Sequence, residues 1–145
     1  INNFSLELIN TEYEFQTLLG KKIKLSGENL VFMQNNNVIN LAGELSLDEE
    51  LDVISNLDVM LSMDSGNAHL AAMLGKKVVT IWGVTHPFAG FAPFNQSENN
   101  GLVANRTTFP LIPTSVYGNK YPDTYTEVAG STAPKIVIDK VKSII

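Results

Sequence analysis

The chain has 145 residues, of which 44% are hydrophobic and 17% charged, and it contains no cysteine. This composition suffices for the core of one domain, and it excludes disulfides, thiolate zinc sites and cysteine nucleophiles. The net charge is −5 and no long basic run occurs, so we expect no nucleic-acid partner and no attraction to an anionic membrane surface. No apolar run reaches the roughly 18 residues of a membrane span, so no transmembrane segment is predicted.

The first part of the chain carries only weak patterns. Leucine and phenylalanine recur over residues 4–19 at loosely helical spacing, which predicts a helix that ends at Gly20. Residues 22–32 predict short strands around Gly27. Because the first residue is Ile1 and not methionine, we expect the chain to be a fragment or a processed piece of a longer protein.

From residue 38 onward the pattern becomes regular. Residues 38–43, VINLAG, form a short apolar run with β-branched residues, which predicts a strand. Ser46 precedes Glu49 at the spacing of a capping box, and leucine and isoleucine recur behind it at helical spacing, so we expect a helix over residues 47–56.

Two further strands flank a second helix. Residues 58–63, DVMLSM, predict a strand, and residues 67–74 predict a helix that stops at Gly75, a common left-handed cap. Residues 77–82, KVVTIW, are almost continuously apolar, as in a strand covered on both faces. Alternation of strands and helices with short links predicts an α/β fold with a Rossmann-like, doubly wound parallel sheet, in a single domain over residues 1–145.

The remaining residues show a less regular pattern of apolar and polar positions. Residues 84–131 are rich in glycine, proline, asparagine, threonine and tyrosine, and they predict turns with a short strand near residues 102–104. Pro134 opens a final amphipathic helix. We expect its apolar side to consist of Ile136, Val137, Val141 and Ile144.

The turn Asp64-Ser65-Gly66-Asn67, which opens the second helix, is the first candidate site. Ligands bind beyond the carboxyl ends of strands in open parallel sheets. Free N–H groups at a helix start attract anions, Gly66 lets a ligand approach the backbone, and Ser65 can donate its hydroxyl to a phosphate. His69, in the first helical turn, could face the same ligand. The alternative is that Asp64 and Ser65 only cap the helix and that His69 is a packed or surface residue.

The loop GVTHPFAGFAP, residues 83–93, is the second candidate site because it also follows a predicted strand. Thr85 and His86 could contact a ligand there, and the prolines and Gly90 would fix the course of the loop. The alternative is an ordinary surface turn. Trp82, just before the loop, is expected to lie in the core.

Three sharper chemistries find little support. Asp64, Ser65 and His69 lie too close along one turn to converge as a catalytic triad, and no G-x-S-x-G elbow occurs. The histidines, His69 and His86, have no clustered carboxylates near them in the sequence, so no metal site is predicted. Neither a Walker loop nor a G-x-G-x-x-G turn is present.

The segment DVMLSMDSGNAHLAAMLGKKVVTIWGVTHPFAG, with the preceding NVINLAGELSLDEEL, resembles the C-terminal signature of glycosyltransferase family 9, the heptosyltransferases of lipopolysaccharide synthesis. The spaced D-S-G-x-x-H-L-A-A, followed by an apolar strand and G-x-T, is the most specific part. The resemblance implies the C-terminal half of a GT-B enzyme, in which two Rossmann-like domains face each other across a cleft. It also implies a nucleotide-sugar donor, usually ADP-heptose, and neither a metal nor a cofactor.

The resemblance implies roles for the first candidate site. Asp64 would contact the donor sugar and His69 would support the site, so these two are the expected catalytic residues. The donor diphosphate would be held through the backbone amides of Ser65, Gly66 and Asn67.

The resemblance also implies roles for residues outside that turn. The Thr85-His86 loop would border the sugar or phosphate, and Asn40, Ala42 and Gly43 would lie near the nucleoside. In this family the base is generally a carboxylate of the N-terminal domain, through which the lipid-linked saccharide acceptor would also bind. The expected location is the cytoplasm, including a peripheral position at the inner face of the inner membrane.

Three hypotheses therefore remain open at the level of the sequence. The first is the donor half of a sugar transferase, which on its own binds donor weakly and transfers nothing. The second is a non-catalytic module that binds nucleotides or sugar phosphates. The third is a structural α/β domain that docks a partner through an exposed apolar patch.

Overall fold

The computed structural model describes residues 7–8, 13–16, 22–25, 31–32, 41 and 43–145. The chain divides into two compact units, Ile1–Ser46 and Leu47–Ile145.

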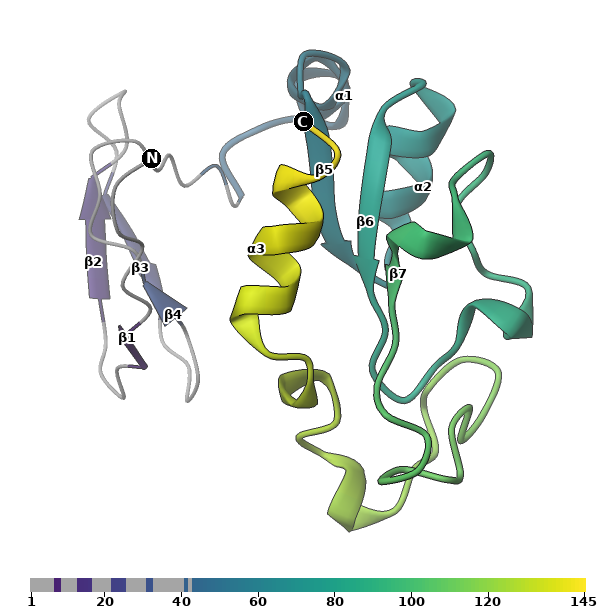
Figure 1. Ribbon diagram of the computed structural model, residues 1–145. Coiled ribbons are helices and arrows are strands. Elements are labelled where there is room, and N and C mark those ends of the chain that lie inside the picture. The colour runs from purple at the N-terminus through teal and green to yellow at the C-terminus, as the bar shows by residue number, and fades with distance from the viewer. Residues whose placement is uncertain (1–6, 9–12, 17–21, 26–30, 33–40, 42) are drawn as a thin grey trace. The chain divides into compact units, whose positions relative to one another are not determined.

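Antiparallel strand pairs form the first unit, drawn in purple and blue in Figure 1. Strand β1 (Glu7–Leu8) pairs with β4 (Val31–Phe32), and β2 (Tyr13–Gln16) pairs with β3 (Lys22–Leu25). The short strands predicted within residues 22–32 are confirmed by β3 and β4.

The helix predicted over residues 4–19 is wrong, because β1 and β2 lie in that segment. The sequences YEFQ and KIKL alternate apolar and polar residues with the period of two that is typical of strands. In the register of β2 and β3, Tyr13 is the partner of Leu25 and Glu14 the partner of Lys24.

The strand predicted over residues 38–43 is wrong at its carboxyl end. Leu41 belongs to no strand, and Gly43 lies in a turn with a φ of 73°. The amide of Glu44 donates to the carbonyl of Leu41 over 3.2 Å and closes that turn. Residues 38–40 and 42 of the predicted strand, Asn40 among them, lie outside the described residues.

A three-stranded parallel sheet organises the second unit, in the order β5 (Val59–Met63), β6 (Lys77–Ile81) and β7 (Gly101–Leu102). Helix α1 (Leu47–Ser55) precedes β5, and helix α2 (Gly66–Met73) connects β5 to β6. The bounds of these four elements from α1 to β6 agree with the sequence to within a residue or so. The predicted α/β fold with a parallel sheet is therefore confirmed.

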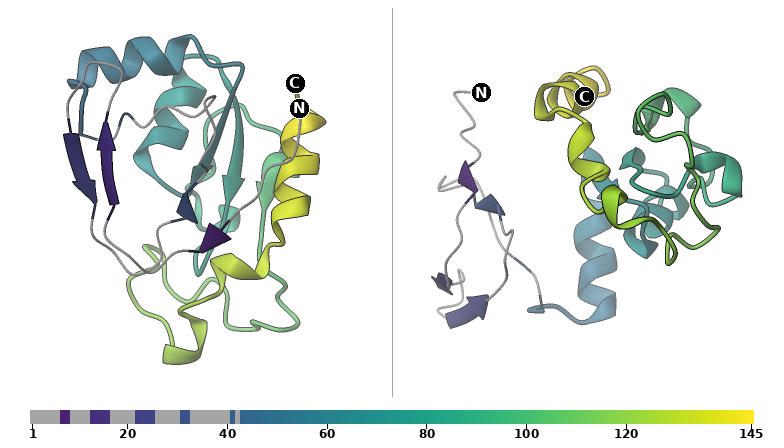
Figure 2. Two further views of the ribbon diagram at one scale, coloured as in Figure 1. Left: turned by 90° about the vertical axis from the view of Figure 1, so that its left-hand side faces the viewer. Right: turned by 90° about the horizontal axis from the view of Figure 1, so that it is seen from below.

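Helices cover both faces of this sheet. Figure 1 and the left view of Figure 2 place α2 behind the strands and the yellow helix α3 (Pro134–Lys142) in front of them. The half-buried apolar residues toward the end of the chain are Val137, Ile138, Val141 and Ile144. Ile136, which we expected on the apolar side, is 52% exposed, so Ile138 takes the place predicted for it.

Helix α2 packs closely on the sheet because its buried residues are small. Ala68, Ala71 and Ala72 are at most 5% exposed and form one core cluster with Ile54 of α1 and Val78 of β6. The helix ends as predicted at Gly75, whose φ is 74°. The amide of Gly75 donates to Ala72, and the next amide donates to the carbonyl of Ala71 over 2.9 Å, which satisfies the last carbonyls of the helix.

The irregular region 84–131 contains short 3-10 helices and a second core. The 3-10 helices are Pro87–Ala89, Glu98–Asn100, Asp123–Tyr125 and Ala129–Ser131. The buried residues of this second cluster are Ala104, Ile112, Tyr125 and Val128. The short strand predicted at residues 102–104 is present as β7, one residue earlier.

One side chain extends the sheet where β7 is too short. Strand β7 pairs only with Thr80 and Ile81 of β6. Further back along β6, the side-chain oxygen of Gln96 accepts from the amide of Val78 over 2.8 Å, and its nitrogen donates to the carbonyl of Lys76 over 3.1 Å. The Gln96 amide therefore occupies the ladder position that a longer neighbouring strand would fill.

Candidate functional site

Both predicted site loops leave the same edge of the sheet. Strands β5 and β6 are parallel, and Met63 at the end of β5 is the register partner of Ile81 at the end of β6. The Asp64 turn and the loop beginning at Trp82 therefore start side by side at the carboxyl edge, where open α/β sheets bind ligands.

The Asp64 turn leaves the start of α2 open. Ser65 has extended backbone angles, φ −155° and ψ 166°, and makes no side-chain hydrogen bond to the helix. Its hydroxyl instead shares a hydrogen bond of 2.8 Å with the hydroxyl of Ser62. Among the described residues, no hydrogen-bond acceptor is recorded for the amides of Gly66 and Asn67, and both residues are exposed. Of the two interpretations of this turn, side-chain capping by Ser65 is not found.

The space in front of this turn can accommodate a ligand. A Cβ placed on Gly66 would meet no atom of the described residues within 4 Å. Asp64 and His69 are both half-buried beside the turn. Between them, the buried Ala68 holds the first turn of α2 against the sheet. The arrangement combines free N–H donors, a carboxylate and an imidazole within one short segment.

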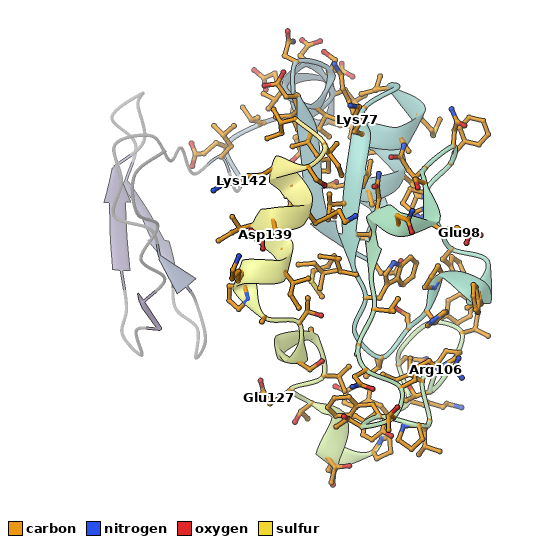
Figure 3. The ribbon with its side chains drawn as sticks, viewed as in Figure 1. Lys77, Glu98, Arg106, Glu127, Asp139 and Lys142 are labelled. Atoms are coloured by element: carbon orange, nitrogen blue, oxygen red, sulfur yellow. The ribbon has the colours of Figure 1, made fainter. Side chains whose placement is uncertain are left out.

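Thr85 and His86 are buried, at 8% and 5% exposure, so the second loop is not an ordinary surface turn at these two positions. The Nδ1 atom of His86 accepts from the amide of Phe88 over 3.2 Å, and the two rings lie 4.5 Å apart. Burial lowers the pKa of His86, and the positive charge of Arg106, which is labelled in Figure 3, lowers it further. Both effects favour the neutral imidazole, which caps the 3-10 helix that follows.

The side chain of Thr85 packs against a distant glycine. A Cβ placed on Gly118 would lie only 2.8 Å from the Thr85 methyl group. The contact with Gly118 thus holds the loop after β6 in place. This contact positions the backbone of the loop. The ligand contact of Thr85 stays a prediction.

The remaining predicted residues belong to the first unit, so their contacts with the nucleoside stay a prediction. Gly43 lies in the turn of the first unit, and the site loops belong to the second. Asn40 lies outside the described residues.

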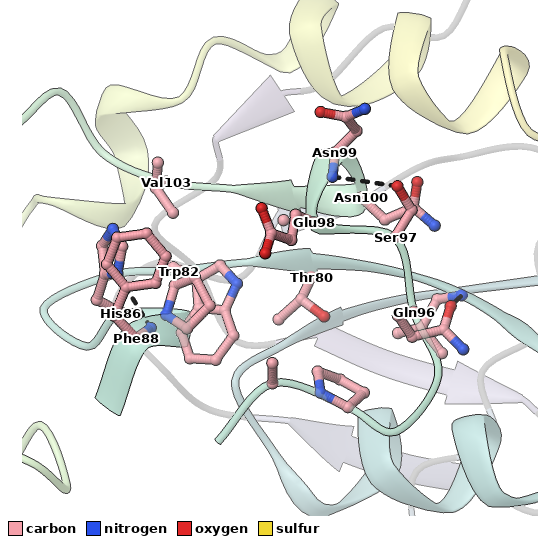
Figure 4. A pocket seen from close by; sticks show the side chains of 15 residues that line it. Thr80, Trp82, His86, Phe88, Gln96, Ser97, Glu98, Asn99, Asn100 and Val103 are labelled. Carbon is pink, nitrogen blue, oxygen red and sulfur yellow. Dashed lines mark hydrogen bonds between the residues drawn. The ribbon is translucent and has the colours of Figure 1, made fainter. Parts of the chain in front are cut away.

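A cavity that the sequence did not reveal opens beside β6 and β7 (Figure 4). Its volume is about 380 Å³, and its wall includes Thr80, Trp82 and His86, with Glu98 from the segment before β7. Trp82 is 1% exposed, so the expectation that it lies in the core is confirmed. The polar run QSENN before a strand was the available signal, but it carries no periodicity that separates a cavity wall from a surface loop.

The described residues also limit other site types. In the part of the chain that the structure describes, no three or more acidic or histidine side chains are grouped so that they could hold a metal ion. No described helix is both long enough and apolar enough to cross a membrane.

The model of the family "Glycosyltransferase family 9 (heptosyltransferase)" matches residues 16–117, which is well over half of the chain. The chain belongs to glycosyltransferase family 9. The resemblance predicted from residues 37–93 is thereby confirmed, and both site loops fall inside the matched segment.

Two curated heptosyltransferases match the chain over short segments. Lipooligosaccharide heptosyltransferase 2 of Haemophilus influenzae is 37% identical over 49 residues, which is 34% of this chain and 14% of that protein. The lipopolysaccharide core heptosyltransferase OpsX of the same organism is 37% identical over 60 residues, 41% of this chain and 17% of that protein. Each match thus covers less than a fifth of the relative. No solved structure matches the chain significantly.

Proposed function

We propose that this family 9 chain binds the nucleotide-sugar donor of a glycosyltransferase of lipopolysaccharide core synthesis, with ADP-heptose as the donor. Family membership supports the transfer of a sugar. The names of the two Haemophilus relatives support a heptose as that sugar and a lipopolysaccharide or lipooligosaccharide as its destination. The proposal rests on one observation, the uncapped start of α2 at the carboxyl edge of the sheet.

That helix start suits the diphosphate of the donor. Backbone N–H groups and the positive end of the helix dipole attract phosphate oxygens. Because the Ser65 hydroxyl is bound to Ser62 and not to the helix, the amides of Gly66 and Asn67 remain available. The open space in front of Gly66 allows the phosphates to approach the backbone.

The neighbouring side chains would then act on the sugar. In this proposal the half-buried Asp64 accepts hydrogen bonds from sugar hydroxyls and His69 supports it, while Thr85 and His86 hold the adjoining loop beside the phosphate. Asn40 and Gly43 would contact the nucleoside.

An inverting transfer with these parts needs no metal ion. The helix start would stabilise the charge that develops on the departing nucleoside diphosphate. A carboxylate of another domain would act as the base for the acceptor hydroxyl. We therefore propose that this chain is the C-terminal half of a GT-B enzyme that works in the cytoplasm, at the inner face of the inner membrane, on a lipid-linked saccharide.

Amide NMR titration of the chain with ADP, GDP, UDP and their sugar conjugates tests the proposal. ADP should shift the amides of Ser65, Gly66 and Asn67, and Gly66→Val should weaken ADP binding about tenfold because its side chain occupies the open space. Ser65→Ala is the matched control and should bind ADP normally, since the Ser65 hydroxyl is bound to Ser62 and the diphosphate would be held by backbone amides. Equal ADP binding by the valine variant would contradict the diphosphate site.

Asp64→Ala separates the sugar from the nucleotide. This variant should bind ADP as the unchanged chain does, but it should lose the additional shifts that ADP-heptose causes. If the variant weakens ADP and ADP-heptose equally, Asp64 does not contact the sugar.

A non-catalytic nucleotide-binding module is the second candidate, because each named relative is matched over less than a fifth of its length. Radiolabelled transfer assays of this chain and of a longer protein that includes it distinguish the two. We expect no transfer by this chain and transfer by the longer protein. Donor binding without transfer by either would favour the module.

A further inference from the structure

The cavity beside β6 and β7 is a second place where a small molecule can bind. Its volume of about 380 Å³ falls within the range of roughly 300–1,000 Å³ that is usual for ligand sites. No residue of the Asp64 turn lines it. A ligand in this cavity would therefore lie outside the Asp64 turn, although His86 belongs both to the cavity wall and to the loop proposed to border the phosphate.

Three donors in the wall have no hydrogen-bond partner among the described residues: the Thr80 hydroxyl, the indole nitrogen of Trp82 and Nε2 of His86. Their residues are only 1–5% exposed, yet the described part of the chain contains no buried side-chain nitrogen or oxygen without a partner. These three atoms must therefore reach open space, which the cavity provides. Because Nδ1 of His86 accepts from the Phe88 amide, the neutral ring carries its proton on Nε2.

An acceptor and an apolar surface complete the wall. Glu98 is exposed, and no described residue forms a hydrogen bond or ion pair with its carboxylate, which Figure 4 shows turned toward Trp82 and Thr80. Phe88, at 79% exposure, and Val103 add apolar area at the rim. Among the described residues that line the cavity there is no lysine or arginine.

This combination of groups selects a class of ligand. The Glu98 carboxylate, with no lysine or arginine among the described residues of the wall, disfavours phosphates and other anions. A sugar ring offers what the wall can use: an apolar C–H face for an aromatic ring, and hydroxyls that both donate and accept hydrogen bonds. We propose that the cavity binds a neutral pyranose unit, with Trp82 and His86 donating to its hydroxyls, Glu98 accepting from them and Phe88 covering its face.

The indole N–H signal gives a direct test, because Trp82 is the only tryptophan of the chain. The isotope-labelled chain is titrated with methyl α-D-glucopyranoside, maltotriose and glucose 6-phosphate to about 100 mM, well above a millimolar Kd. The two neutral sugars should shift the indole signal and the amides of Glu98 and Asn100, and glucose 6-phosphate should not. Tighter binding of maltotriose identifies a unit within a glycan as the source, and equal binding identifies a single sugar.

Matched variants assign the contacts. Glu98→Gln should weaken the binding of the neutral sugars about tenfold, since a charged acceptor is lost from an exposed position that folding does not need. Phe88→Ala should also weaken it, whereas Phe94→Ala should not, because Phe94 is similarly exposed but lies outside the cavity.

Several outcomes would overturn the proposal. These are the absence of an indole shift with either neutral sugar, equal shifts with glucose 6-phosphate, and unchanged binding by Glu98→Gln. Shifts of the same indole and Glu98 signals by ADP alone would also overturn it, because the cavity would then belong to the nucleotide. The amides of Gly66 and Asn67 report on the donor site in the same spectra, so failure of one site is distinguished from failure of the other.

Discussion

Residues 47–82 and residues 84–131 both bury a core, but they do so in opposite ways. In the first region, the buried residues recur at the period of a helix or follow a continuous strand, as Ala68, Ala71 and Val78 do. In the second region, Ile112, Tyr125 and Val128 lie on turns and short 3-10 segments with no common period. A core therefore does not require helices or strands, provided that the backbone N–H and C=O groups find other hydrogen-bond partners.

The difference lies in where the backbone groups find their partners. In residues 47–82 most of them pair within α1, α2 and the β5–β6 ladder. The irregular region instead uses individual long-range contacts. The hydroxyl of Tyr125 accepts from the amide of Leu111 over 3.3 Å, and the amide of Thr114 donates to the carbonyl of Val84 over 3.0 Å. Single substitutions should therefore disturb the irregular region more than the regular one.

Removing Ile112 should have the largest effect on this comparison. Ile112 is 2% exposed in the second core, so Ile112→Ala should cost about 3 kcal/mol of unfolding free energy in a denaturant titration. Leu111→Ala is the control, because Leu111 is 59% exposed, and it should change little. Hydrogen exchange of the α2 amides shows whether the two regions unfold together. Equal effects of the two substitutions would contradict the role assigned to the second core.

Gly118→Ala should have the next largest effect, about 2 kcal/mol, because it combines a left-handed backbone with a clash. The new Cβ would lie 2.8 Å from the Thr85 methyl group, at a φ of 65°. Gly90→Ala shares the positive φ but meets no atom within 4 Å, so it should cost only about 1 kcal/mol. Thermal unfolding of both variants measures the difference, and equal costs would mean that the Thr85 contact yields easily.

Gly75→Ala tests the regular region. It should lower the free energy of unfolding by about 1 kcal/mol, because alanine disfavours the left-handed backbone of this helix cap. Gly130→Ala is the comparison, because its backbone is not left-handed and its Cβ would meet open space. A cost for Gly130→Ala as large as that for Gly75→Ala would argue against the cap as the cause.

The smallest expected effect is the dependence of stability on pH through His86. The folded state lowers the pKa of this ring below its ordinary value of 6.5, so the unfolded state binds the proton more readily. The contribution of the neutral ring to stability is complete above 6.5 and is lost as the pH falls through the lowered folded pKa. His86→Asn keeps an acceptor for the Phe88 amide but does not titrate. Its denaturation midpoint should fall less on acidification than that of the unchanged chain; parallel pH curves would contradict this.

The sequence predicted what periodicity and caps determine. The bounds of α1, β5, α2 and β6, the glycine cap at residue 75 and the parallel sheet follow from alternation of apolar residues with helix starts and stops. The prediction was wrong at residues 4–19. A few leucines there have helical spacing, but the segment forms the paired strands β1 and β2.

The candidate site was predictable only in part, because its chemistry depends on partners that a sequence does not reveal. The position of the Asp64 turn follows from the strand before it. The sequence does not reveal the directions of side chains. The hydrogen bond between the Ser65 and Ser62 hydroxyls and the one from the Phe88 amide to His86 both depend on those directions. The cavity beside β7 joins residues 78 to 103 through tertiary packing alone.

The Gln96 amide has a consequence for the behaviour of the protein in concentrated solution. An unpaired strand edge offers its N–H and C=O groups to any extended peptide, and edges of this kind seed aggregation. By taking up the Val78 amide and the Lys76 carbonyl, Gln96 removes the part of the β6 edge that β7 leaves open. The Gln96 side chain thus protects this part of the sheet from pairing with the strands of other molecules. It does so where no further strand covers β6.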